Sequence, residues 1–299
     1  MFGKSVEILL LSLHSLSSTI NYSMSNKTKI LYVSQEILPF TPETPTAQQS
    51  RSLPQAVHEG GKETRIFMPR YGKINERRHQ LHEVIRLSGM NLIIDDTDHP
   101  LIIKVASIPQ IRLQVYFIDN QEFFHRKAFF HDENMNMFPD NDMRMIFFTK
   151  GVLETVKKLG WAPDVIHCHG WFTSLMPLYV KQLYKRDPHF ADAKVVTSVY
   201  ADPFEGKLDS KIAQRIAFDG IGMDQMEHLK NPTYENLTKL ALQHSDGAIM
   251  AEQGTLPSLE TYCNSIDLPV LSSFNELDQL SATDEFYDSV VLGKTELVD

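Results

Sequence analysis

The chain has 299 residues, of which 42% are hydrophobic and 22% are charged. Such a chain buries a substantial core in one large domain or two small ones. Its formal net charge of -9 argues against nucleic-acid binding, which needs clustered Lys and Arg. The two cysteines, Cys168 and Cys263, suggest neither a disulfide framework nor a zinc site. We interpret them as reduced thiols of a cytoplasmic protein.

Residues 1–28 form an amino-terminal extension that we exclude from the fold. The apolar run of residues 6–13 is too short to span a bilayer, so no membrane association is expected. Glu7 interrupts this run and only Lys4 precedes it as a base, which is unlike a signal peptide. Three explanations stay open: a mis-assigned start with translation from Met24, an export signal, and a dispensable arm.

Alternating strands and helices are predicted from Lys29 onward. Residues 29–34 are typical of a strand buried on both faces, and residues 64–69 of a second strand. The prolines of residues 39–46 exclude a helix interior, and we expect an extended, exposed turn there. Residues 48–59 predict a helix that ends at Gly60. These segments together predict a βαβ unit.

The segment from residue 81 to residue 128 has a different pattern, typical of a β-meander. Short β-type runs are predicted at residues 84–87, 101–105 and 111–118, with turns at 95–98 and 109–110. Beyond it the alternation resumes, with helices over residues 140–159 and ending at 238–243, and strands near residues 165–166, 194–198 and 246–251.

These elements predict a single Rossmann-like α/β domain over residues 29–252, with a mostly parallel sheet, a β-meander insert and helices on both faces. In residues 161–171 a strand leads into a tight turn and a helix, and ligands bind beyond such strand ends. Residues 253–299 form an acidic tail. We expect residues 286–292 to pack back on the sheet as a helix, and the alternative is an acidic partner-binding tail.

Five motifs follow one another along the chain: residues 29–36 (KILYVSQE), 53–56, 64–72 (TRIFMPRYG), 163–179 (PDVIHCHGWFTSLMPLY) and 245–252. In this order they resemble the amino-terminal domain of bacterial glycogen synthases and plant starch synthases. Those enzymes are retaining glucosyltransferases of the GT-B fold, in which two Rossmann-like domains face each other. The resemblance implies one half of a GT-B fold, the half that mainly holds the acceptor glucan rather than ADP-glucose.

The family's phosphate-binding turn is altered in this chain. Where the family has Lys-Thr-Gly-Gly after the first strand, this chain has Pro42, Glu43, Thr44 and Pro45, while Glu36 is the family-motif position before the turn. Glycines let backbone N–H groups approach a diphosphate, whereas prolines remove N–H donors. We therefore expect no phosphate cradle and no cofactor.

Two further family motifs are also altered. The family's His-Ala-His-Asp-Trp becomes His167, His169 and Trp171 around Gly170, which replaces the aspartate. At the third motif Val199, followed by Tyr200, replaces the active-site histidine. The resemblance therefore implies no catalytic residue here. About 48 residues follow Ala251, too few for the family's nucleotide-binding domain.

Several side chains keep two or more interpretations. His167 and His169 point to one face of a strand and either contact a sugar, form structural hydrogen bonds or bind a metal, although no third ligand is suitably spaced. Trp171 either packs in the core or stacks on carbohydrate. The aromatic run of residues 122–131 either forms a packed cluster or edges a glucan groove; it contains Phe123, Phe124, His125, Phe129, Phe130 and His131.

Two functions follow from this pattern. The first is a glycogen or starch synthase domain, inactive alone, that works with a separately encoded carboxy-terminal GT-B half. The second is a non-catalytic glucan-binding or regulatory module. The expected partners are a glucan or maltooligosaccharide and, for the first function, that second half; neither a nucleic acid nor a membrane is expected.

Overall fold

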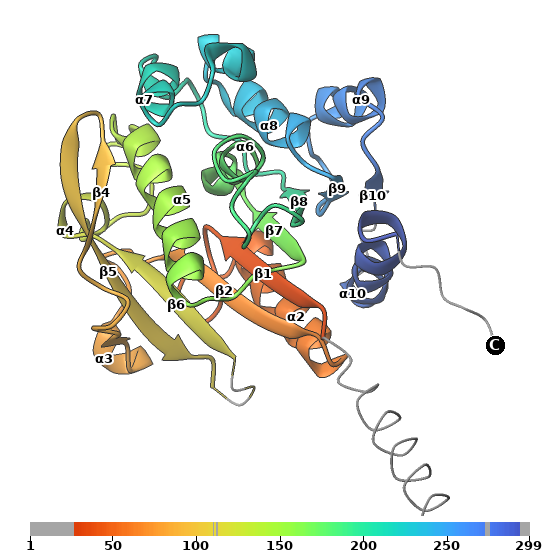
Figure 1. Cartoon of the computed structure of the whole chain (residues 1–299), viewed down its shortest axis with the longest axis horizontal. Coiled ribbons are helices and arrows are strands. Elements are labelled where there is room, and N and C mark those ends of the chain that lie inside the picture. Colours follow the sequence, from red (N-terminus) through yellow and green to blue (C-terminus); the bar gives the residue numbers. More distant parts are fainter. Residues whose placement is uncertain (1–26, 110, 112, 273–275, 294–299) are drawn as a thin grey trace, which may run out of the picture.

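The computed structural model describes residues 27–109, 111, 113–272 and 276–293, so the expectations for residues 1–26 lie outside it. A ten-stranded sheet runs in the order β10-β9-β8-β7-β1-β2-β6-β5-β3, and β4 pairs with β5 off this path (Figure 1). Every neighbouring pair from β10 through β6 is parallel, which confirms the predicted mostly parallel α/β sheet. The strands are β1 Lys29–Ser34, β2 Glu63–Pro69, β3 His82–Glu83, β4 Met90–Ile94, β5 Thr97–Ser107, β6 Gln114–Asp119, β7 Val165–His169, β8 Lys194–Val199, β9 Gly247–Met250 and β10 Val270–Ser272.

The centre of the sheet is formed by β1 and β7, whose residues are apolar or hydrogen-bonded and are buried. All five residues of β7 are buried, as are residues 30–34 of β1. In the parallel register Tyr32 lies beside His167 and Ser34 beside His169. Continuous burial on both faces explains why the sequence of these strands lacks the alternation of a half-exposed strand.

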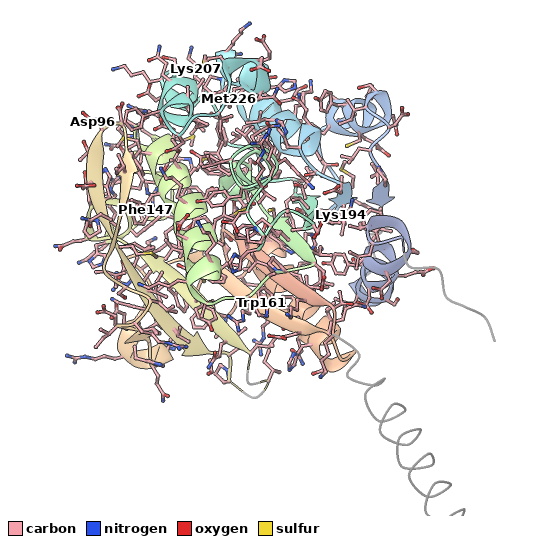
Figure 2. The ribbon with its side chains drawn as sticks, viewed as in Figure 1. Asp96, Phe147, Trp161, Lys194, Lys207 and Met226 are labelled. Carbon is pink, nitrogen blue, oxygen red and sulfur yellow. The ribbon has the colours of Figure 1, made fainter. Side chains whose placement is uncertain are left out.

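Helices cover both faces of this sheet (Figure 1). One face carries α5, η1, α6 and α8, and the other carries α2, α10 and η3. Side chains fill the space between the layers, and Phe147 of α5 is fully buried (Figure 2). The helices are α2 Pro45–Glu59, α3 Glu76–His79, α4 Gln121–Phe124, α5 Asn141–Lys158, η1 Trp171–Thr173, α6 Met176–Gln182, α7 Ile212–Phe218, η2 Met223–Lys230, α8 Tyr234–Gln243, α9 Pro257–Ser265, α10 Glu276–Glu285 and η3 Phe286–Val291.

The meander was predicted correctly as antiparallel structure but with wrong boundaries. Strand β5 pairs antiparallel with β6, β3 and β4. The predicted strand at residues 84–87 is wrong: the N–H of Leu87 donates to the carbonyl of Val84 and closes a turn that leaves Ile85 83% exposed. The strand forms instead at Met90–Ile94, after Gly89. β-type residues in a turn with no partner strand misled the sequence interpretation.

The carboxy-terminal segment adds both an edge strand and a cover to the sheet. Strand β10, which the sequence did not predict, pairs parallel with β9. Residues 286–291 form η3, and Tyr287 is fully buried against the sheet. Lys62 forms ion pairs with Asp284 and Asp288 at 2.6 and 2.7 Å, which tie this segment to the loop before β2. Residues 273–275 and 294–299 of the acidic tail, which include Glu296 and Asp299, lie outside the described residues.

None of the helices in the described ranges combines the length and the apolar character that crossing a bilayer requires.

Candidate functional site

The topology places a crevice at the carboxyl ends of β1 and β7. Strands β2 and β6 lie on one side of β1, and β7, β8 and β9 lie on the other, so the order of the strands reverses between β1 and β7. Open parallel sheets bind ligands at such a reversal. The residues that follow these strand ends are Gln35 and Glu36 after β1, Gly170 after β7 and Asp202 after β8.

The predicted histidine pair lies inside the protein, below this crevice. His167 and His169 are fully buried, and their ring centroids are 4.0 Å apart. Burial lowers the pKa of His169 to about 3. Burial and the neighbouring His169 also lower the pKa of His167 well below its ordinary value. Both imidazoles are therefore neutral at pH 7, and neither contacts a ligand from solvent in this conformation.

The contacts of the two histidines favour structural hydrogen bonding among the interpretations left open by the sequence. His167 Nδ1 lies 2.5 Å from the Tyr287 hydroxyl, and its Nε2 lies 2.7 Å from Ser198 Oγ. His169 Nδ1 lies 2.7 Å from the Tyr200 hydroxyl, which donates to Gln49 Oε1. No group of three or more His, Cys, Asp or Glu within the described ranges is arranged to hold a metal ion.

Trp171 packs in the core rather than at the surface. Only 6% of its surface is exposed, and its ring lies 4.8 Å from each of the rings of Phe130 and Phe204. The indole therefore supports Phe130 from behind. A direct stacking contact with carbohydrate has no room in this arrangement.

The position of the family's aspartate is filled by another residue of this chain. Gly170 has a φ of 82°, and a Cβ added to it would lie 2.3 Å from Gln35 Cδ. Gln35 Oε1 accepts a hydrogen bond of 3.1 Å from the N–H of Phe172. The glycine thus gives both the backbone conformation and the space that the glutamine needs.

Carboxyl groups surround the other side of the Gln35 amide. Its Nε2 donates to Asp202 Oδ2 at 3.0 Å and to Glu36 Oε1 at 3.5 Å, while Glu252 accepts from the N–H of Ala201. Burial, with the negative charges of Glu36 and Glu252 adding to it, raises the pKa of Asp202 to about 7. Burial also raises the pKa of Glu36. Negative charge at this edge disfavours a bound diphosphate.

The turn after β1 is a capped helix start rather than a phosphate cradle. Helix α2 begins at Pro45, earlier than predicted, because Thr44 caps it: Thr44 Oγ1 accepts from the N–H of Ala47 at 3.0 Å and donates to Glu36 Oε2 at 2.6 Å. The turn over residues 39–46 was expected to be exposed, which holds for Pro42 but is wrong for Phe40. Phe40 is buried, and the centroids of the Phe40 and Phe117 rings are 4.9 Å apart.

The position of the family's active-site histidine carries no polar side chain. Val199 ends β8 and is 3% exposed, and its carbonyl accepts from the N–H of Ala251. Tyr200 follows it and turns inward to His169 and Gln49. Neither residue supplies an exposed acid or base to the crevice.

An open groove lies beside the filled crevice. It consists of two adjoining hollows that share Lys73 and Phe129; we call one the glucan hollow, after the ligand proposed for it below, and the other the cationic hollow, after its charged lining. The glucan hollow, about 400 Å³, is lined by Glu36, Lys127, Phe129, Phe130 and His131 among others. The cationic hollow, about 350 Å³, extends to Phe40, Arg78 and His79. Both volumes are typical of small-molecule sites.

The aromatic run of residues 122–131 is divided between two environments. Phe123 and Phe124 are buried and pack around Phe147, whereas Phe129, Phe130 and His131 line the glucan hollow. The packed-cluster interpretation therefore holds for Phe123 and Phe124, whereas Phe129, Phe130 and His131 border an open hollow whose ligand stays a prediction.

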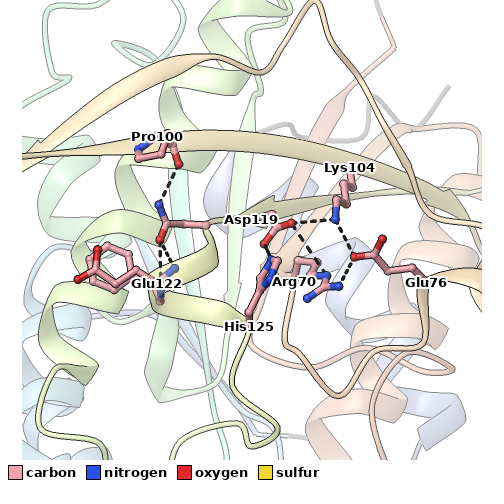
Figure 3. A network of polar contacts seen from close by, with 9 residues as sticks. Arg70, Glu76, Pro100, Lys104, Asp119, Glu122 and His125 are labelled. Carbon is pink, nitrogen blue, oxygen red and sulfur yellow. Dashed lines mark hydrogen bonds and ion pairs between the residues drawn. The ribbon is translucent and has the colours of Figure 1, made fainter.

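A charged cluster joins the turn after β2 to β5 and to the end of β6 (Figure 3). Buried Asp119 at the end of β6 lies 2.9 Å from His125 Nε2 and 3.0 Å from Lys104 Nζ. Glu76 accepts from Arg70 and, at 2.6 Å, from Lys104. The carboxylates of Asp119 and Glu76 are thus paired with the cations of Lys104 and Arg70. These ion pairs hold the turn after β2 against β5.

Several residues of this site were missed by sequence analysis. Gln35, Asp202 and Glu252 each stand within three residues of a strand end, which was the available signal. Lys73 and Arg78 follow β2 in a turn and a short helix, and nothing in the local pattern predicted that Phe129, 56 positions after Lys73, would complete their hollow.

Comparisons with known proteins agree with this geometry. The starch synthase catalytic domain family matches residues 29–256. The chain is 41% identical over 189 residues to a glycogen synthase of Chlorobium limicola, covering 63% of this chain and 39% of that protein. It is 37% identical over 237 residues to a glycogen synthase of Chlorobium phaeobacteroides, covering 78% of this chain and 48% of that protein. The chain spans less than half the length of these curated relatives.

A solved structure has the same fold. The catalytic domain of starch synthase IV from Arabidopsis thaliana, bound to ADP and acarbose, superimposes with a TM-score of 0.69 at 18% identity. The match covers 84% of this chain and 52% of that one, as a GT-B half requires. With the family match over residues 29–256, these findings show that the chain belongs to the starch synthase catalytic domain family and carries a glycogen/starch synthase-like domain.

Proposed function

We propose that the chain is a non-catalytic glucan-binding domain that transfers no glucosyl unit by itself. The observation that carries this proposal is that, of two neighbouring sites at the carboxyl edge of the sheet, one is filled by a side chain and the other is open. The crevice at Gly170 is filled by Gln35, whereas the glucan hollow beside it is open.

The lining of the glucan hollow suits a sugar. The half-buried ring of Phe129 offers an apolar face to the C–H face of a pyranose. Glu36 and Asp132 supply acceptors for hydroxyl groups, and Lys127 supplies a donor. Phe130 forms the floor and is held from behind by Trp171, so Trp171 acts in this proposal as a support for the hollow.

Glucosyl transfer needs groups that this crevice does not offer. A departing diphosphate requires cations or free N–H donors, and removing one such donor costs about 2.7–4 kcal/mol of transition-state stabilisation. Here Thr44 Oγ1 accepts from the N–H of Ala47 at the start of α2, and the carboxyl groups of Asp202, Glu36 and Glu252 add negative charge as they ionise. Val199 supplies no acid or base.

Calorimetric titration of the 299-residue chain with maltoheptaose and with ADP-glucose tests both parts. Maltoheptaose should bind and ADP-glucose should not. Phe129→Ala should weaken maltoheptaose binding about tenfold, the effect of losing a stacking contact and its buried area. Phe218→Ala, at an exposed phenylalanine of α7, is the matched control and should change nothing. Binding of ADP-glucose, or no binding of maltoheptaose, would refute the proposal.

A second candidate function rests on the length of the relatives. Because the chain covers 39% and 48% of the two glycogen synthases, it also suits one subunit of a two-chain synthase in the cytoplasm. The two free, buried cysteines support the cytoplasmic location. Co-purification with a nucleotide-binding GT-B half, with glucosyl transfer only by the pair, would favour this function over the first.

A further inference from the structure

The cationic hollow differs from the glucan hollow in charge. Its lining includes Lys73 and Arg78 and contains no Asp or Glu. Asn75 and His79 add polar atoms from the same segment, and Thr41 adds a hydroxyl group from the turn after β1. The net charge of the chain is -9, so a hollow whose charged lining residues, Lys73 and Arg78, are both positive differs in sign from the chain as a whole.

The two cations are not neutralised by neighbouring carboxylates. Neither Lys73 nor Arg78 forms an ion pair with another residue of the described ranges, and both are exposed. Lys73 Nζ lies 5.3 Å from the centre of the Phe129 ring, so its charge stands where the two hollows meet. Burial and then the positive charge of Arg78 lower the pKa of His79, and both side chains line this hollow.

Two acidic side chains that lie near this lining in the sequence are bound to other residues. Glu76, on the same short helix as Arg78, accepts from Lys104 and Arg70 (Figure 3) and does not line the hollow. Glu43, next to the lining residue Pro42, accepts a 2.6 Å hydrogen bond from Gln48 of α2. Within the described ranges, no carboxylate in the cationic hollow itself competes with a ligand for Arg78 and Lys73, although Lys73 also borders the glucan hollow, which Glu36, Asp132 and Glu133 line.

We propose that the cationic hollow binds the phosphate monoester of a phosphorylated glucose unit, with the sugar ring on the Phe129 side. A phosphate monoester carries nearly two negative charges at pH 7, which two cations match. Arg78 offers a planar pair of donors and Lys73 a point charge, the usual combination for phosphate oxygens. Asn75 Oδ1 accepts from the N–H of Arg78 at 3.0 Å, which leaves its amide N–H groups as donors.

Two sources of this group are distinguishable. The phosphate is carried either by a free sugar phosphate or by a unit of a phosphorylated glucan whose neighbouring units continue into the glucan hollow. Only the second source rests on the proposed function, because only it needs both hollows. The shared residues Lys73 and Phe129 make the two hollows continuous.

The test is calorimetric titration of the full chain with glucose 1-phosphate, glucose 6-phosphate, a phosphorylated maltooligosaccharide, maltotriose and inorganic phosphate. At least one phosphorylated sugar should bind more tightly than inorganic phosphate, and its affinity should fall as NaCl rises. Arg78→Gln and Lys73→Gln should each weaken it about tenfold or more, as expected for the loss of a charged hydrogen bond. Tighter binding of the phosphorylated oligosaccharide than of either free sugar phosphate identifies the glucan as the source.

Arg77→Gln is the matched control, because Arg77 is exposed on the same helix but does not line the hollow. It should change the affinity less than twofold. An equal loss in Arg77→Gln, or no binding of any phosphorylated sugar, would overturn the proposal. Binding of maltotriose with no phosphorylated sugar bound would leave the glucan hollow intact and remove only the phosphate site. If a phosphorylated sugar binds and maltotriose does not, the phosphate site stands and only the proposed use of the glucan hollow is contradicted.

Discussion

The side-chain amide of Gln35 lies against the backbone of Gly170, with Gln35 Cδ 2.3 Å from the place where a Cβ on Gly170 would stand. The same amide accepts from the N–H of Phe172 and donates to Asp202. Gln35 therefore links the ends of β1, β7 and β8 across the crevice, and it does so only because residue 170 has no side chain.

Gly170→Asp should destabilise the protein without creating activity. The substitution forces an L-residue to a φ of 82° with a ψ of 160°, a region that only glycine adopts readily, at a cost of about 1–3 kcal/mol. It also drives a side chain into Gln35, at a cost of about 1–3 kcal/mol. The free energy of unfolding measured with urea should therefore fall by more than the backbone cost alone. Gly206→Ala is the control, because Gly206 has a φ of 80° and open space around it; an equal loss in both variants would show that Gln35 contributes nothing.

Asp202→Asn should flatten the pH dependence of stability. The pKa of Asp202 in the folded protein, about 7, lies above the ordinary aspartate value of 3.8, so the native state binds more protons than the unfolded state between these two pH values. The free energy of unfolding therefore falls as pH rises from about 4 to about 7, by at most about 1.4 kcal/mol per pH unit for this group. The raised pKa of Glu36 gives a slope of the same sign. Urea titrations from pH 4 to pH 8 should show a smaller slope in Asp202→Asn, and an unchanged slope would contradict this assignment.

Tyr287→Phe should lower the free energy of unfolding by about 1–3 kcal/mol, because it leaves buried His167 Nδ1 without its hydrogen-bond partner. Chemical denaturation measures the loss. Tyr262→Phe removes a similar hydroxyl–imidazole contact, 3.0 Å from His228 Nε2, at a less buried place and should cost less. A loss in Tyr287→Phe no larger than that in the control would argue against a structural role of the buried network.

The isolated chain should not extend glycogen with ADP-glucose, and Val199→His with Gly170→Asp should not restore activity. Those substitutions leave the capped start of α2 and the three surrounding carboxyl groups unchanged. Groups that act together in catalysis are not restored one at a time. Radiolabelled glucose appearing in polymer above a buffer control, with either protein, would contradict the prediction.

The mostly parallel sheet and its buried central strands were predictable from local pattern. Residues 29–34 and 165–169 carry runs whose burial on both faces follows directly from their composition. The turn at residues 84–87 was not predictable, since its β-type residues satisfy the pattern of a strand but have no neighbouring strand to pair with. Strand β10 was missed for the opposite reason: three residues are too few for a period, and only the edge of β9 makes them a strand.

The sequence by itself determined the family, the loss of the glycine turn and the replacement of the aspartate and the histidine, because each of these depends on which residue stands at one position of a motif. The tertiary structure alone decided that His167 and His169 are buried, that Gln35 fills the space over Gly170 and that Lys73, Arg78 and Phe129 line one hollow. Accessibility and proximity depend on which elements pack together. Tyr287 lies 120 positions from the histidine it contacts, and no local pattern carries that information.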